Sequence, residues 1–208
     1  MGGDNLLNND ELQTRINNFK QDVKTLSADE IISKYYYNDF PPAALSLDLY
    51  HKLRLEIKTH FKLESIFNVF LVGSGRLGFS IKPQNEYREF NDDSDLDIVI
   101  VSKELFETYW NHMREYDQNL VYWKDASVFE NTFYNGWMRP DKLPKNKSFV
   151  DPLNWWEYFE KLSASNLFGR IKIRGGLYYS LDALESYQKK AINKLKLKES
   201  LNNANDSN

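Results

Sequence analysis

Hydrophobic side chains recur at intervals of three and four residues along much of this chain, a spacing typical of amphipathic helices. The first stripe follows Asn9 and Asp10, either of which can cap a helix, and the second follows Ser27, which pairs with Glu30 as a capping box. Prolines 41 and 42 end the second helix, because each disfavours helix in the residue before it. Helices are predicted at 10–25, from 27 onward, at 46–61, near 152–162, and along the stripes 105–116 and 181–195.

Shorter apolar runs predict strands. The first run is rich in branched and aromatic residues and ends at a glycine, which is typical of a buried strand. The second and third alternate between polar and apolar residues, and two consecutive glycines interrupt the third. These strands are predicted at 65–72, 95–101 and 170–174. The intervening polar stretch 82–93 predicts an exposed loop, and 122–156 predicts irregular structure before the short helix.

This order of elements predicts an α+β protein with a small mixed sheet flanked by helices and a mainly helical N-terminal segment. Its 208 residues, of which 41% are hydrophobic and 15% aromatic, can build the core of one compact domain. We expect a single domain, 1–208, made of N-terminal helices (1–64), a sheet-containing core (65–200) and a frayed tail (201–208).

Charge and cysteine content narrow the function classes. The formal net charge of −3 argues against broad electrostatic capture of nucleic acid. The chain has no cysteine, and its three histidines are not spaced as zinc ligands. It also lacks the basic-then-apolar start of a signal peptide and any apolar run that could span a membrane, so we expect a cytoplasmic protein without a membrane partner.

The strongest chemical signal lies between residues 71 and 101. Gly73 and Ser74 form a turn at a strand end, where backbone N–H groups and a hydroxyl can hold phosphates. Asp95 and Asp97, two residues apart on the next strand, point to the same side and can share Mg²⁺ or Mn²⁺. Taken alone, the turn can be purely structural and the aspartates an acidic strand edge. Together, the two features favour phosphoryl or nucleotidyl transfer.

This arrangement resembles the nucleotidyltransferase superfamily that includes DNA polymerase beta. The resemblance covers about 30 residues. It rests on the motifs Val72-Gly73-Ser74, Gly78 and Asp95-Leu96-Asp97. It implies a sheet of nucleotidyltransferase type, phosphate contacts from Gly73 and Ser74, and Mg²⁺ bound by Asp95 and Asp97. The segment Gly-Ser-Gly-Arg-Leu-Gly is similar to the corresponding segment of minimal bacterial nucleotidyltransferases, some of which act in toxin–antitoxin pairs.

The sequence departs from the family pattern in two ways. The interval from Ser74 to Asp95 is longer than usual, so residues 82–93 would be an inserted loop that either contacts substrate or is neutral decoration. The third carboxylate that the family carries on a later strand is not evident, because Lys172 and Arg174 stand where it is expected. The remaining candidates are Asp151, as ligand or base, and the weaker Asp125 and Asp182.

Several basic and aromatic residues are candidates for nucleotide contacts. Arg76 and Lys82, with Lys172 or Arg174 on the later strand, can neutralise triphosphate charge, although each can equally be solvated surface charge. The loop 136–144, which contains Trp137, can stack a base or contact a partner, or its tryptophan can be part of the core.

Two functions therefore compete. The first is a Mg²⁺-dependent nucleotidyltransferase that moves a nucleoside monophosphate from a nucleoside triphosphate to a hydroxyl of RNA, protein or a small molecule. Its catalytic residues would be Asp95, Asp97 and Asp151, and its nucleotide contacts Gly73, Ser74, Arg76 and Gly78. The second is a nucleotide-binding subunit with little or no turnover, working with a protein partner in a toxin–antitoxin or antiviral defence system.

Overall fold

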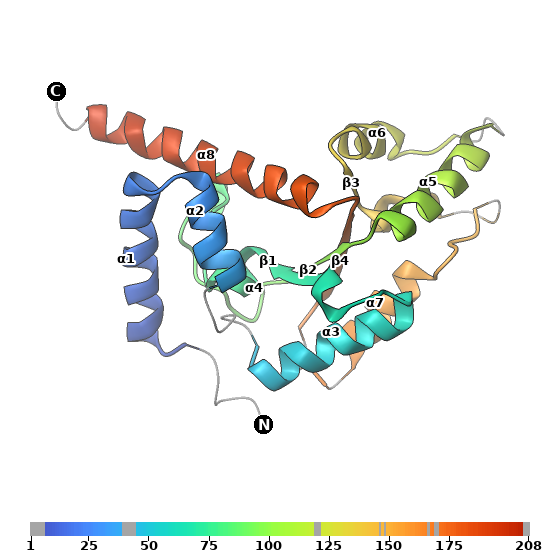
Figure 1. Ribbon diagram of the computed structural model, residues 1–208, viewed down its shortest axis with the longest axis horizontal. Helices are drawn as coiled ribbons and strands as arrows, with labels where there is room; N and C mark the ends of the chain where they lie inside the picture. The colour runs from blue at the N-terminus through green and yellow to red at the C-terminus, as the bar shows by residue number, and fades with distance from the viewer. Residues whose placement is uncertain are drawn as a thin grey trace.

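A computed structural model describes residues 7–38, 45–118, 122–145, 147, 149–165, 167–168 and 171–205. The elements are α1 (Asn9–Thr25), α2 (Ala28–Ile32), a π-helix (Ser33–Asn38), α3 (Leu47–Phe61), a 3-10 turn (Ile66–Asn68), β1 (Val69–Val72), α4 (Gly73–Leu77), a 3-10 turn (Pro83–Asn85), β2 (Leu96–Val101), α5 (Lys103–Gln118), α6 (Ala126–Tyr134), β3 (Trp137–Met138), a 3-10 turn (Pro140–Lys142), α7 (Trp155–Ala164), β4 (Ile173–Tyr178) and α8 (Leu181–Asn205) (Figure 1). Prolines 41 and 42 lie outside the described residues.

The four strands form one mixed sheet in the order β1-β2-β4-β3. β1 runs antiparallel to β2, β2 runs parallel to β4, and β3 pairs antiparallel with β4. β3 pairs only with Leu177 and Tyr178, so the first part of β4 has an edge that no strand covers in the described chain. The mixed α+β class expected from the sequence is confirmed.

One face of the sheet carries the larger hydrophobic core. Side chains from alternate positions of β1, β2 and β4 meet α3, α5 and α7 there, and Leu53, Ile100, Tyr109 and Trp155 are among the most deeply buried. Alternation in the strands brings this apolar set to one face and leaves the other face for residues such as Asp97. Helices α3 and α7 lie side by side on the same side of the sheet in Figure 1.

A second core joins the two ends of the chain. Phe19 of α1 and Ile31 of α2 are fully buried against Ile192 and Leu195 of α8 and against Leu77 of α4. Figure 1 shows α8, in orange to red, crossing over α1 and α2. Lys196 adds a polar link, because its Nζ donates to the backbone oxygens of Val23 at 2.5 Å and Leu26 at 2.6 Å. The expected N-terminal helical segment 1–64 thus divides, with α1 and α2 in this core and α3 in the other.

Most helices begin where capping chemistry predicts. Ser27 and Glu30 form the expected capping box of α2, and the hydroxyl of Ser102 accepts from the N–H of Leu105 at the start of α5. Asn8, rather than Asn9 or Asp10, caps α1, because its side chain accepts from the N–H of Glu11 while Glu11 bonds back.

Four expectations are corrected. The run 65–72 opens with a 3-10 turn, so only its last four residues are strand. The segment expected to be irregular contains α6 and β3. The third strand does not stop at Gly175 and Gly176 but runs through them as β4. Helix α8 continues to Asn205 into the expected frayed tail, and it buries Leu184, Gln188, Ile192 and Leu195 while Leu181 and Tyr187 stay exposed.

Candidate functional site

The turn after β1 brings Gly73 against the carboxylate of Asp97. Val72 is the register partner of Asp97, so the chain turns away directly above it. Gly73 has a φ of +63°, and a Cβ at this position would lie 3.0 Å from Oδ2 of Asp97. Both observations require glycine, because other residues rarely adopt this φ and the space is already occupied. The glycine turn and the acidic strand therefore meet in the fold as they do in the sequence pattern.

Ser74 and Gly78 form the two ends of the one-turn helix that follows. Ser74 is half-buried at its start, and its backbone oxygen accepts from the N–H of Gly78 at 2.8 Å. Gly78 ends the helix with a φ of 91°, and its oxygen accepts from the N–H of Phe90 at 2.8 Å. Gly78 thus shapes the turn by its left-handed backbone and its link to the inserted loop.

Arg76 is buried between the glycine turn and the N-terminal helices. Its side chain is buried, with 4% of its surface exposed, and its Nε donates to the backbone oxygen of Tyr35 at 3.0 Å. Arg15 of α1 in turn donates to the backbone oxygen of Arg76 at 3.1 Å. The guanidinium therefore joins the glycine turn to the N-terminal helices. This burial contradicts the alternative that Arg76 is solvated surface charge, and its contact with a nucleotide stays a prediction.

The inserted loop 82–93 is tied to the ends of the chain. Glu89 accepts from Gln13 of α1 at 2.6 Å, and Glu86 pairs with Lys198 of α8 at 2.6 Å. Tyr87 packs against Phe79 and lies under the ammonium of Lys20. These contacts give most of the loop a structural role. Lys82, at the start of the loop, is exposed, and its positive charge offsets part of the rise that burial causes in the pKa of Asp97.

Asp97 and Asp95 lie on the same side of the sheet, away from the larger core. Asp97 is half-buried within β2, and Asp95 directly precedes the strand. Burial raises the pKa of Asp97 and the negative charge of Asp95 adds to this, whereas Lys82, Arg174 and Arg139 act in the opposite direction. Asp97 is therefore a carboxylate with little water around it that faces several cations.

Arg174 occupies the position where the family pattern expects a third carboxylate. It is the register partner of Asp97 on the adjacent parallel strand β4, and its Nε lies 2.8 Å from Oδ2 of Asp95. The two side chains are 45% and 30% exposed, so the ion pair is open to solvent. Within the described ranges, no three carboxylate or imidazole side chains gather as a metal site would require. Asp95 and Asp97 therefore face the guanidinium of Arg174 and not a third carboxylate.

Asp151, the sequence candidate for the third carboxylate, has a different role. Its Oδ1 accepts from the hydroxyl of Tyr109 and the N–H of Leu153, both at 3.0 Å, and its Oδ2 accepts from the N–H of Trp155 at 2.7 Å. These bonds satisfy the first turn of α7 and join it to α5. Asp151 is thus a helix-capping residue and not part of a cluster with Asp95 and Asp97.

Trp137, a candidate from the sequence for base stacking or for the core, lies with Tyr178 and Tyr187 on the same face as Asp97. Trp137 of β3 stacks on Tyr178 of β4 at 5.8 Å between ring centroids, and Tyr187 of α8 meets its edge at 5.2 Å. Burial and the charge of Asp97 together raise the pKa of Tyr187. The periodicity of α8 placed Tyr187 on its apolar stripe, and only the pairing of β3 with β4 shows which residues it meets.

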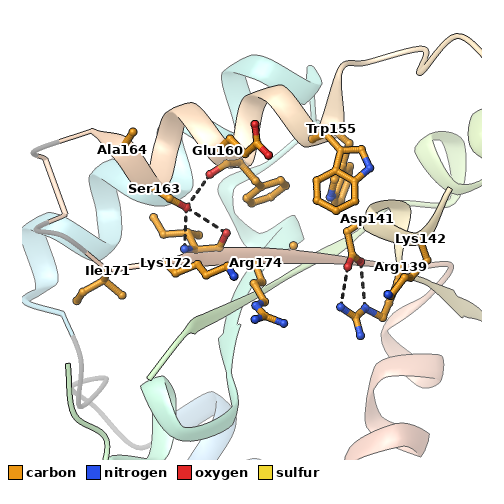
Figure 2. Close-up of a pocket in the computed structure, with 14 residues that line it drawn as sticks. Arg139, Asp141, Lys142, Trp155, Glu160, Ser163, Ala164, Ile171, Lys172 and Arg174 are labelled. Carbon is orange, nitrogen blue, oxygen red and sulfur yellow. Dashed lines mark hydrogen bonds and ion pairs between the residues drawn. The ribbon is translucent and has the colours of Figure 1, made fainter. Parts of the chain in front are cut away.

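A cavity of about 670 Å³ opens beside this site, between α7 and the uncovered edge of β4. Figure 2 shows α7 above the strand, with Ser163 and Trp155 facing it, and the Arg139–Asp141 ion pair at one end. Arg174 and Arg139 belong both to the cavity lining and to the charges that act on Asp97. The sequence does not indicate this cavity, because its walls combine the predicted helix near 152–162, the predicted strand 170–174 and part of the segment expected to be irregular, and local patterns do not show how these segments pack.

Two further findings complete the description. None of the helices in the described residues combines the length and apolar composition that crossing a membrane requires. Comparison with known proteins finds no match, whether to a protein-family model, a curated protein or a solved structure.

Proposed function

We propose that this protein binds a nucleoside triphosphate in front of Gly73 and Asp97 and transfers its nucleoside monophosphate to a hydroxyl of RNA, protein or a small molecule. The observation that supports this proposal is the closeness of the glycine turn to the acidic strand, where a Cβ on Gly73 would lie only 3.0 Å from Oδ2 of Asp97. A phosphate-holding turn and a pair of carboxylates at one point of the fold are what this chemistry needs.

In this proposal the chain itself holds and orients the triphosphate. The Ser74 hydroxyl and the backbone of the turn contact phosphate oxygens, while Lys82, Arg139 and Arg174 balance the negative charge. The acceptor hydroxyl oxygen bonds to the α-phosphorus, and the bond from that phosphorus to the bridging oxygen of the β-phosphate breaks. Pyrophosphate leaves with the bridging oxygen, and the hydroxyl proton passes to water.

The donor set fits one Mg²⁺ carried by the nucleotide better than a pair of metal ions. Asp95 and Asp97 supply two carboxylates on one side, and Mg²⁺ bound with phosphates commonly uses one or two. A second metal ion would need a further ligand where Arg174 lies. When bound, the metal supplies charge neutralisation on the triphosphate and lowers the pKa of the acceptor hydroxyl.

The test is isothermal titration with ATP, GTP, CTP and UTP in Mg²⁺. At least one nucleotide should bind, and the Asp95→Asn/Asp97→Asn double variant should bind it at least about tenfold more weakly, because a carboxylate–metal contact is lost. Asp92→Asn/Asp93→Asn is the matched control, since both residues are exposed in the adjacent loop. Equal affinity in the two double variants would refute the site.

A second candidate function is nucleotide binding without turnover, as a regulatory subunit. The ion pair of Arg174 with Asp95 favours it, because a fixed guanidinium stands where catalysis in the family needs a carboxylate. Labelled nucleoside triphosphates offered with RNA, protein and small-molecule acceptors separate the two functions, and transferred label would exclude this one.

The Arg174→Asp variant probes the same question through metal binding. It places a carboxylate opposite Asp97 in register, so Mn²⁺ affinity measured by electron paramagnetic resonance without nucleotide should rise by at least about tenfold. Arg174→Gln is the control that removes the charge without adding a ligand. An unchanged Mn²⁺ affinity in Arg174→Asp would show that position 174 is not the vacant ligand position.

A further inference from the structure

We propose that the cavity between α7 and β4 is the acceptor site and that it takes a nucleotide, bound through its base and its phosphate. This inference rests on the proposed transferase function, since it names the acceptor class for the same site. Four features of the cavity support it: its position, its open strand edge, its apolar floor and its charge.

The position of the cavity joins it to the triphosphate site. Arg174 lines the cavity and also pairs with Asp95, and Arg139 lines it beside Asp141. In Figure 2 both arginines extend from the cavity toward the side of the sheet away from α7. Arg174 therefore links the cavity to the acidic pair.

The open edge of β4 offers one donor and one acceptor. Even-numbered residues of β4 bond to β2, as the N–H of Leu96 to the oxygen of Lys172 shows, so odd-numbered residues face the other edge. There, Ser163 Oγ accepts from the N–H of Ile173 at 2.8 Å, its hydroxyl proton is shared between the oxygens of Phe159 at 2.7 Å and Ile173 at 3.3 Å, and Leu177 is paired with Met138. Between Ile173 and Leu177, Gly175 faces the cavity with both its N–H and its C=O in the described chain.

A single exposed N–H and C=O pair suits a base better than a peptide. An extended peptide that adds to a sheet needs several consecutive backbone bonds, and this edge offers one residue. A nucleobase presents an acceptor beside a donor on one edge, which one strand residue can satisfy. The flat ring then rests on Trp156 and Ile171, the half-buried apolar residues of the lining, because Trp155 and Phe159 keep only 1% and 6% of their surface exposed.

The charge at the cavity fits an anionic ligand. Four basic side chains line it, namely Arg139, Lys142, Lys172 and Arg174, against two acidic ones. Two of the basic residues are already paired, Arg139 with Asp141 through contacts of 3.0 and 2.6 Å and Arg174 with Asp95 at 2.8 Å. Lys142 and Lys172 then remain against Glu160. The volume of about 670 Å³ lies in the range of small-molecule sites, so the cavity suits one nucleotide and not a long nucleic acid.

The experiment uses nucleoside monophosphates as probes. AMP, GMP, CMP and UMP are titrated into the protein saturated with Mg²⁺ and the non-reactive analogue α,β-methylene-ATP. At least one should bind, and ribose 5-phosphate, which lacks the base, should bind at least about tenfold more weakly if Gly175 reads the base.

Charge reversal on the rim locates the binding. The Lys142→Glu/Lys172→Glu variant should weaken monophosphate binding at least about tenfold at low salt, and by a larger factor than it weakens binding of the analogue. The matched control is Lys52→Glu/Lys194→Glu, which reverses two exposed lysines on α3 and α8. Equal weakening in both variants would place the monophosphate elsewhere and overturn the proposal.

The remaining outcomes separate this inference from the proposed function. If the analogue binds but no monophosphate does, the acceptor assignment fails and the triphosphate site stands. If monophosphates bind through Lys142 and Lys172 but no triphosphate binds, the cavity is a nucleotide site and its role as acceptor is overturned. If an acidic peptide such as Glu-Glu-Gly-Glu-Glu binds and the monophosphates do not, the nucleotide class is wrong.

Discussion

Two glycines lie where the fold leaves little room for a side chain, and their neighbours differ. A Cβ on Gly73 would meet the carboxylate of Asp97 at 3.0 Å, whereas a Cβ on Gly175 would meet the rings of Phe159 at 2.4 Å and Trp155 at 2.6 Å. Gly73 allows the backbone to lie close to a carboxylate, and Gly175 allows α7 to pack closely against β4. The same residue type thus indicates chemistry in one place and packing in the other.

The largest expected effect is on the Gly175 side. Gly175→Ala should lower the free energy of unfolding by about 3 kcal/mol, because inserting a methyl group into a filled core forces backbone and ring shifts. Urea unfolding followed by circular dichroism measures it. Adding Phe159→Leu should recover part of the loss, and a midpoint in Gly175→Ala equal to that of the unaltered protein would contradict the close contact.

A smaller stability effect is expected at Gly73, combined with loss of binding. Gly73→Ala should cost about 1 to 2 kcal/mol, because an alanine at positive φ is strained. It should also weaken nucleoside triphosphate binding by at least about tenfold, because the methyl group displaces the Asp97 carboxylate. Unfolding and titration are measured on the same samples.

Gly73→Asn separates the two causes at this position. Asparagine tolerates positive φ better than alanine, so this variant should regain stability but not nucleotide binding. Recovery of both would show that the backbone conformation alone matters, and the difference from Gly175 would then be one of degree.

A still smaller effect concerns the charge of Asp97. Burial raises the pKa of Asp97 in the folded protein above its ordinary value of 3.8, so the folded state holds a proton that the unfolded state has released. Stability therefore falls as the pH rises from the unfolded to the folded pKa, and the penalty persists above it. Asp97→Asn should raise the urea midpoint at pH 7 and change it little at pH 3. A lower midpoint at pH 7 would contradict this sign.

The smallest effect is expected at Arg174. Its pair with Asp95 is open to solvent, and such pairs contribute about 0 to 1 kcal/mol. Arg174→Ala should therefore shift the thermal midpoint by no more than a few degrees. A large loss of stability would show that the guanidinium has a structural role. The region around Asp97 would then contribute to stability as the packed region around Gly175 does.

The sequence predicts local features well where neighbouring residues decide them. The capping box at Ser27, the strand that follows Asp95 and the turn at Gly73 all depend on short-range preferences. The expected closeness of Gly73 and Asp97 also follows from local order, because two adjacent antiparallel strands joined through a loop bring them together.

Contacts between distant segments could not be predicted. Gly175 and Gly176 continue the strand because they pair with Ile98 and Val99 of β2, and at Gly175 the aromatic residues of α7 leave no room for a larger side chain. Nothing near the glycines in the sequence indicates either contact. Arg76 resembles a phosphate ligand until Tyr35, 41 residues earlier, supplies its hydrogen-bond acceptor. The carboxylate of Asp151 likewise accepts hydrogen bonds from the N–H of Trp155 in the first turn of α7 and from the hydroxyl of Tyr109.

The link from Lys196 to the end of α1 also governs when the molecule can finish folding. Lys196 and Val23 are 173 residues apart, so the core that holds the first two helices cannot close until the last helix has been synthesised. Arg76, which fixes the glycine turn, bonds to that same N-terminal region. A nascent chain that lacks α8 would therefore carry the glycine turn and Asp97 without the core that supports them, and under the proposed function nucleotide binding would arise only after α8 has been synthesised.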